Sequence, residues 1–124
     1  MPGKKILVVD DEPEVRQLME HFLTERGYEV RLAENGQLAL AALETFTPDV
    51  VLLDMHMPEM DGLETLKRLA VRSPSLPVIM ITVNEDIETT ARLLQLGAAD
   101  YVPKPFNLEY LEQAINIQLS AARE

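Results

Sequence analysis

The chain has 124 residues and a formal net charge of −10 at pH 7, from 21 acidic and 11 basic side chains. With 47% hydrophobic and 26% charged residues, the composition favours a single folded acidic domain over a disordered acidic tail. The negative charge disfavours direct binding to nucleic acid or anionic membrane, and the absence of Cys excludes disulfides, thiol catalysis and zinc–thiolate sites.

The chain opens with a wholly apolar run at residues 6–9, followed by a segment of helical period. Runs that are apolar at every position are typical of strands covered on both faces, as in a parallel sheet. Over residues 15–23 the apolar positions follow the spacing of one helix face, with Pro13 suited to the first turn and Gly27 to the C-terminal end. A weaker apolar run at residues 28–33 then predicts a second strand.

The same alternation continues in the middle of the chain. Asn35 and Gly36 open an Ala- and Leu-rich helix that must end by Pro48, and residues 50–53 form the next apolar run. A third helix is expected over about residues 62–71.

The last two repeats complete the pattern. Residues 78–81 predict a fourth strand, a helix follows over about 85–96, and a weaker strand lies at 99–102. Asn107 is a candidate N-cap for the last helix. The apolar stripe of that helix consists of Leu108, Leu111, Ile115 and Leu119.

A β-α unit repeated five times predicts an α/β fold with a single five-stranded parallel sheet flanked by five helices, flavodoxin-like and doubly wound. Right-handed crossovers leave few topologies, and the strand order 2-1-3-4-5 is the common one at this length. We expect one domain over residues 1–124. In such a sheet, ligands bind outside the carboxyl ends of the strands, between the first and third strands.

Polar side chains follow the predicted strands at these ends. Asp10 and Asp11 end the first strand, Asp54 the third and Thr82 the fourth, and Lys104 follows the fifth. Crowded carboxylates repel one another unless a cation is bound, and oxygen ligands with room for water suit Mg²⁺. A carboxylate at the rim can form an acyl phosphate, while the metal, the ammonium and the hydroxyl group stabilise the phosphoryl oxygens.

Each of these residues also has an ordinary explanation. Loop carboxylates are usually solvated, and two Asp residues before a helix can simply cap it. A Thr at a strand end is common. The coincidence of five polar groups at neighbouring strand ends is what favours a divalent-metal site that handles phosphate.

The whole chain resembles a receiver domain of two-component response regulators. The resemblance rests on the motifs VVDDE at 8–12, DMHMPEMDG at 54–62, Thr82, and YVPKPF at 101–106. These motifs stand in order over about the full length of the chain, and as a set they are highly specific.

The resemblance implies that Asp54 is the phosphoacceptor, phosphorylated by a histidine kinase, a phosphotransfer protein or a small donor such as acetyl phosphate. Asp11 and Asp54, with the backbone carbonyl of His56, would hold Mg²⁺ or Mn²⁺. Asp10 would contact the ion mostly through water. The domain would catalyse its own phosphorylation and slow dephosphorylation, so it is an enzyme only in that limited sense.

The resemblance also implies a switch. Lys104 would pair with the phosphoryl group, Thr82 would move toward it, and Tyr101 would turn inward into the space that Thr82 leaves. This would change the output surface of the fourth helix, fifth strand and fifth helix, which would contact an effector domain or protein or form a homodimer. Ile117 and Leu93 either lie on that surface or are buried beneath it. The kinase would dock near the first helix and the loop after the fifth strand.

Several positions flank the expected site. Val83 is bulkier than the small residue usual in the family and is expected to narrow access to the acceptor carboxylate. His56 and Asn84 occupy positions that tune phosphoryl lifetime in the family, and Pro105 forms a bond that the family often holds cis. Gly62 is expected to supply backbone geometry that other residues avoid.

Three other functions fit the sequence less well. A flavodoxin-like cofactor binder is disfavoured because the acidic loop after the first strand would repel a flavin phosphate. A true phosphatase generally has a second acid two residues beyond its nucleophile, where this chain has His56. A pseudo-receiver, acting as a phosphorylation-independent interaction module, is disfavoured by the complete residue set.

The sequence also indicates where in the cell the protein is expected. No apolar run approaches the roughly 20 residues that a membrane span needs, and the first residues do not form a signal peptide. We expect a soluble, cytoplasmic protein whose response at DNA, if it has one, comes from an attached or recruited partner.

Overall fold

The computed structural model describes residues 3–55, 62–83, 86–104 and 106–121. Strands and helices alternate along the described chain. In order they are β1 (Lys5–Val9), α1 (Pro13–Glu25), β2 (Glu29–Ala33), α2 (Gly36–Ala42), β3 (Val50–Asp54), α3 (Gly62–Arg72), β4 (Val78–Thr82), α4 (Ile87–Gln95), β5 (Asp100–Pro103) and α5 (Leu108–Ala121).

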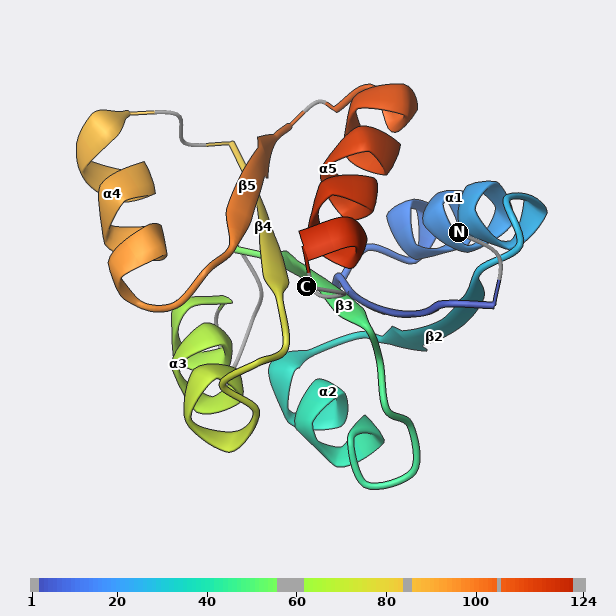
Figure 1. Cartoon of the computed structure of the whole chain (residues 1–124), viewed down its shortest axis with the longest axis horizontal. Helices are drawn as coiled ribbons and strands as arrows, with labels where there is room; N and C mark the ends of the chain where they lie inside the picture. Colours follow the sequence, from blue (N-terminus) through green and yellow to red (C-terminus); the bar gives the residue numbers. More distant parts are fainter. Residues whose placement is uncertain (1–2, 56–61, 84–85, 105, 122–124) are drawn as a thin grey trace.

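The strands form one parallel sheet in the order β2-β1-β3-β4-β5 (Figure 1). Within the described residues, five helices flank it. The predicted fold class and strand order are therefore confirmed. None of the described helices is long and apolar enough to cross a membrane.

The apolar strands are buried on both faces because helices cover both sides of the sheet. Ile6 and Val8 point into a core cluster shared with α1 and α5, whereas Leu7 and Val9 point into a second cluster shared with α2, α3 and α4. The two layers of helices are visible on opposite sides of the sheet in Figure 1. All five residues of β3 and all five of β4 are buried, which explains why these strands read as continuous apolar runs.

Side-chain caps set several helix ends. The Asn35 Oδ1 atom accepts a hydrogen bond from Leu38 N at 2.8 Å, and the Asn107 Oδ1 atom accepts one from Glu109 N at 2.7 Å. The helix predicted to begin at about residue 85 begins at Ile87, because Asp86 is its N-cap and accepts a hydrogen bond from Thr89 N at 3.0 Å.

Because the sheet is buried on both faces, the same substitution should have different effects on a strand and on an exposed helix face. Val51 is 0% exposed in β3, whereas Val71 is 83% exposed on α3. Val51→Ala should lower the free energy of unfolding by about 2 kcal/mol, because it leaves a cavity in the core. Val71→Ala should change it by less than about 0.5 kcal/mol. Urea denaturation followed by circular dichroism measures both, and equal losses would contradict the assigned burial.

Candidate functional site

The candidate site lies at the carboxyl ends of the strands, where the predicted polar residues meet. Asp54 and Thr82 are the last residues of β3 and β4, while Asp10 and Lys104 directly follow β1 and β5. Main-chain hydrogen bonds continue past the strand ends: Met55 N donates to Ile81 O at 2.9 Å, and Lys104 N donates to Thr82 O at 2.8 Å. The sheet therefore fixes the backbone from which each functional side chain projects.

Lys104 joins the acidic groups of the site. Its Nζ atom lies 3.3 Å from Asp54 Oδ1, 3.5 Å from Asp10 Oδ2 and 3.6 Å from Glu12 Oε1. Burial disfavours the ammonium form, but the attraction of Asp10, Asp54 and Glu12 outweighs it and raises the pKa of Lys104. Lys104 is therefore a permanent cation of the site at neutral pH.

Asp10 is a buried carboxylate whose ionised form is disfavoured. It is 1% exposed, and burial raises its pKa, against the opposing effects of the Glu12 N–H group and Lys104. Its Oδ1 atom accepts a hydrogen bond from Glu12 N at 2.9 Å, whereas Oδ2 has no hydrogen-bond partner among the described residues. The groups around Asp10 therefore do not fully offset the cost of burying its charge.

The donor set fits a hard divalent cation. Asp10, Asp11 and Glu12 each present a carboxylate oxygen, and these oxygens lie within 4.8 Å of one another. Oxygen-only donors of graded exposure, from buried Asp10 to exposed Glu12, suit an ion that keeps several water ligands, as Mg²⁺ does. The Asp10 Oδ2 atom, which has no hydrogen-bond partner among the described residues, supports the same conclusion.

Glu12 was not predicted as a site residue, although it belongs to the quoted motif. The sequence signal was its position directly after two Asp residues. Its contact with Lys104 depends on side-chain conformation at the start of α1, which the sequence pattern does not reveal.

Thr82 and Tyr101, the two predicted switch residues, lie on adjacent strands. Thr82 is buried, and its Oγ1 donates to Met55 Sδ at 3.2 Å. Tyr101 is half-buried and packs against the core cluster beneath α2, α3 and α4. The structure brings Thr82 to the edge of the sheet where Asp54 ends β3. The movement of Thr82 and Tyr101 on phosphorylation stays a prediction.

Gly62 has a different role from the one predicted. Positive φ angles occur at other described glycines, Gly3, Gly27 and Gly97. What Gly62 requires is space: a Cβ atom there would lie 2.5 Å from Met55 Cα and 2.6 Å from Asp54 O. Its N–H also donates to Met55 O at 3.0 Å, so the start of α3 packs directly on the backbone of the candidate acceptor.

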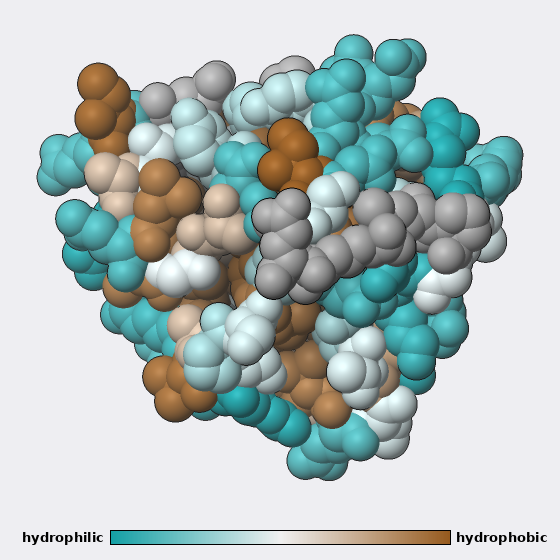
Figure 2. Space-filling view, viewed as in Figure 1, coloured by the Kyte–Doolittle hydropathy of each residue, from teal (hydrophilic) through white to brown (hydrophobic). Residues whose placement is uncertain are grey.

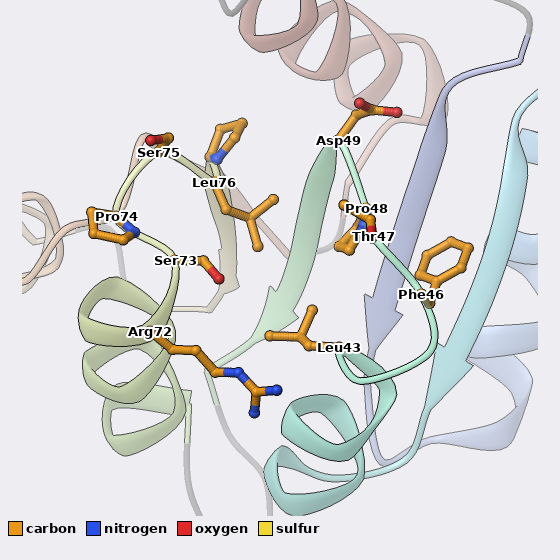
Figure 3. A pocket seen from close by; sticks show the side chains of 11 residues that line it. Leu43, Phe46, Thr47, Pro48, Asp49, Arg72, Ser73, Pro74, Ser75 and Leu76 are labelled. Carbon is orange, nitrogen blue, oxygen red and sulfur yellow. The ribbon is translucent and has the colours of Figure 1, made fainter.

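Two hollows lie at opposite ends of the strands. A groove of about 900 Å³ lies beside Lys104 between α1 and the start of α5. Its apolar lining consists of Val15, Leu18, Phe22, Val83, Phe106 and Leu108. A cavity of about 460 Å³ lies at the amino ends of β3 and β4 (Figure 3), lined by Leu43, Phe46, Leu76 and Arg72 among others, and the strand length separates it from the acidic cluster.

Val83 is exposed on the wall of the groove, and its expected effect on access to Asp54 stays a prediction. The predictions for His56, Asn84 and Pro105 fall outside the described residues.

Comparison with known proteins gives a consistent result. The family description "Response regulator receiver domain" matches residues 6–116. Regulatory protein AtoC of Escherichia coli is 41% identical over 118 residues, covering 92% of this chain and 26% of that protein. The DNA-binding transcriptional regulator NtrC of Salmonella typhimurium is 44% identical over 104 residues, covering 84% of this chain and 22% of that protein. The chain thus spans about a quarter of the length of these two relatives.

Solved structures of similar proteins have the same fold as this chain. A CheY-like response regulator receiver domain protein from Methanospirillum hungatei superposes with a TM-score of 0.92 at 30% identity, covering 98% of this chain and 97% of that one. Chemotaxis protein CheY4 of Vibrio cholerae gives a TM-score of 0.90 at 34% identity, covering 94% and 99% of the two chains.

The burial of Asp10 predicts that this residue costs stability in the metal-free protein. Because its folded-state pKa is raised, its contribution favours folding below the ordinary value of 3.8 and is lost as pH rises through the folded pKa. Asp10→Asn should therefore raise the free energy of unfolding at pH 7 by about 1 kcal/mol without divalent cations. Denaturation across the acidic to neutral range measures this, and a stability loss at pH 7 would contradict it.

The close approach at Gly62 predicts a clash when a methyl group is added. Gly62→Ala should lower the free energy of unfolding by about 2 kcal/mol or more, because backbone atoms of Asp54 and Met55 must shift. Gly3→Ala is the comparison, since no atom lies within 4 Å of a Cβ built there, although its positive φ adds some strain. Thermal unfolding of the two variants distinguishes them, and equal stabilities would contradict the assigned packing.

Proposed function

Because the chain belongs to the family of response regulator receiver domains, we propose that it is a phosphoacceptor in a two-component phosphorelay, with Asp54 receiving the phosphoryl group. The observation that carries the proposal is the position of Lys104, whose Nζ contacts Asp54 and Asp10 together. A buried carboxylate beside a fixed ammonium and an acidic cluster suits nucleophilic attack on phosphorus. The proposal treats residues 1–124 as one receiver domain.

In the proposed reaction, an Asp54 carboxylate oxygen forms a bond to phosphorus. The bond from phosphorus to the donor breaks, and the electron pair leaves with an imidazole nitrogen of a phosphohistidine or the acetate oxygen of acetyl phosphate. Lys104 would exchange part of its contact with Asp54 for a phosphoryl oxygen, which its distance of 3.3 Å allows.

The acidic cluster would hold the cofactor. Asp11 and Asp54 would bind Mg²⁺ or Mn²⁺ together with the carbonyl of His56, and Asp10 would contribute mostly through water. The ion would offset negative charge on the phosphoryl oxygens. Glu12, the exposed member of the cluster, is placed to hold a water ligand or to pair with Lys104.

The groove beside Lys104 is the proposed docking surface for a histidine kinase or phosphotransfer protein. Its apolar wall on α1 and the start of α5 opens next to the candidate acceptor site, so a helix seated there would present its phosphohistidine to Asp54. Val83 on the same wall would limit entry of water or a small donor.

The proposed output surface comprises α4, β5 and α5. Thr82 would leave Met55 Sδ for the phosphoryl group, and Tyr101 would move into the vacated space. Of the two residues left open by the sequence, Leu93 is buried and Ile117 is exposed. Apolar patches on the side of α4 are visible at the left of Figure 2, where an effector domain, an effector protein or a second copy would bind.

The function is tested by incubating the protein with Mg²⁺ and acetyl phosphate. Wild type should gain one acid-stable, alkali-labile phosphate, whereas Asp54→Asn should gain none above background, because its amide is a poor nucleophile. Mass spectrometry measures the added group.

Asp49→Asn is the matched control, since Asp49 lies before β3 at the opposite end of the strand, and it should be labelled like wild type. Label retained by Asp54→Asn at wild-type level would refute the assignment of the acceptor. A folded wild type that takes no phosphate from either a kinase or acetyl phosphate would favour the pseudo-receiver alternative.

A further inference from the structure

We infer that Arg16 is a positioning residue that orients the acidic cluster for its cation, an inference that rests on the proposed Mg²⁺ site. Arg16 lies on α1, and its Nη1 donates to the main-chain carbonyl of Asp10 at 2.6 Å. Its Nη2 lies 3.9 Å from Glu34 Oε2, in the segment after β2. The Arg16 side chain is only 15% exposed, so it is not an ordinary solvated residue of a helix surface.

The hydrogen bond from Arg16 fixes the peptide group that joins Asp10 to Asp11. Because this group is planar, the direction of the Asp10 carbonyl sets the direction of the Asp11 N–H and the position of its Cα. On its other side, Asp10 N donates to Ala33 O at 3.1 Å. The peptide groups on both sides of Asp10 are therefore held, one by the last residue of β2 and the other by α1.

A guanidinium group suits this role because its planar fork presents donors in a fixed geometry to separate acceptors. Here the Asp10 carbonyl accepts the hydrogen bond from Nη1, while the Glu34 carboxylate, on a different segment, forms an ion pair with Nη2. A lysine at this position would keep the charge and could make one of the contacts, but a single ammonium does not fix the plane of the peptide group.

Positioning and simple charge effects predict opposite results for Mg²⁺ binding. The Arg16 cation repels a divalent cation nearby, so removal of its charge alone would tighten Mg²⁺ binding. Loss of orientation would weaken Mg²⁺ binding, as is typical when a partner that orients a metal ligand is removed. The sign of the change therefore separates the two effects.

The test compares Arg16→Met and Arg16→Lys with a matched control, Arg72→Met. Arg72 also donates through Nη1 to a main-chain carbonyl, that of Leu40 at 3.1 Å, but near the amino ends of β3 and β4. Mg²⁺ is titrated into each 124-residue chain, and the dissociation constant is read from amide resonances by NMR. Arg16→Met should raise the constant about 10-fold and Arg16→Lys by a smaller factor, while Arg72→Met should leave it unchanged.

A second readout needs no metal. In the metal-free protein, the Asp11 amide resonance should shift in both Arg16 variants and stay in place in Arg72→Met, because only the former release the Asp10–Asp11 peptide group. Circular dichroism establishes that each variant is folded. If Arg16→Met does not fold, Arg16→Lys decides the result.

Two outcomes would contradict the inference, and they can be told apart. Unchanged or tighter Mg²⁺ binding in a folded Arg16 variant, beside a wild type that binds Mg²⁺, overturns the positioning role alone. A wild type that binds no Mg²⁺ at millimolar concentration overturns the proposed metal site, and the positioning role with it.

Discussion

The contact of one ammonium group with three carboxylates is the interaction on which the candidate site is built. Lys104 Nζ lies within 3.6 Å of Asp54, Asp10 and Glu12. Burial of the Asp10 carboxylate at the edge of the sheet disfavours its ionised form, and Lys104 offsets only part of that cost. In the proposed function, a divalent cation would offset the remaining negative charge when Asp54 accepts the phosphoryl group.

The sheet allows this concentration of charge because its interior is apolar on both faces. β3 and β4 contribute ten buried positions, of which Asp54 and Thr82 at the carboxyl ends are the polar ones. Polar groups are thus confined to the edge, where main-chain hydrogen bonds hold them. The apolar core stabilises the fold, and part of that stability is lost in keeping the functional charges together.

Regular features were predictable from the sequence because they repeat. The apolar runs indicated a parallel sheet, and the handedness of its crossovers led to the strand order and to the meeting of Asp10, Asp54, Thr82 and Lys104. Ends of elements were less accessible, since α4 begins where the Asp86 side chain happens to accept a hydrogen bond.

Contacts that depend on side-chain conformation were not predictable. The pairing of Glu12 with Lys104, the hydrogen bond from Thr82 to Met55 and the contact of Arg16 with Asp10 leave no pattern in the sequence. The case of Gly62 is instructive: its residue type signalled a special position, but the reason is close packing on Asp54 rather than an unusual φ angle.

The assembly of the site from separate strand ends also has a consequence for how the chain matures. Asp10, Asp54 and Lys104 are far apart in sequence and meet through parallel strand pairings that each span at least one helix, and such non-local pairings form late relative to local structure. A chain still emerging from the ribosome lacks β5 and its lysine until most of the other elements have been made. Binding of a cation at the proposed site would therefore require the completed sheet.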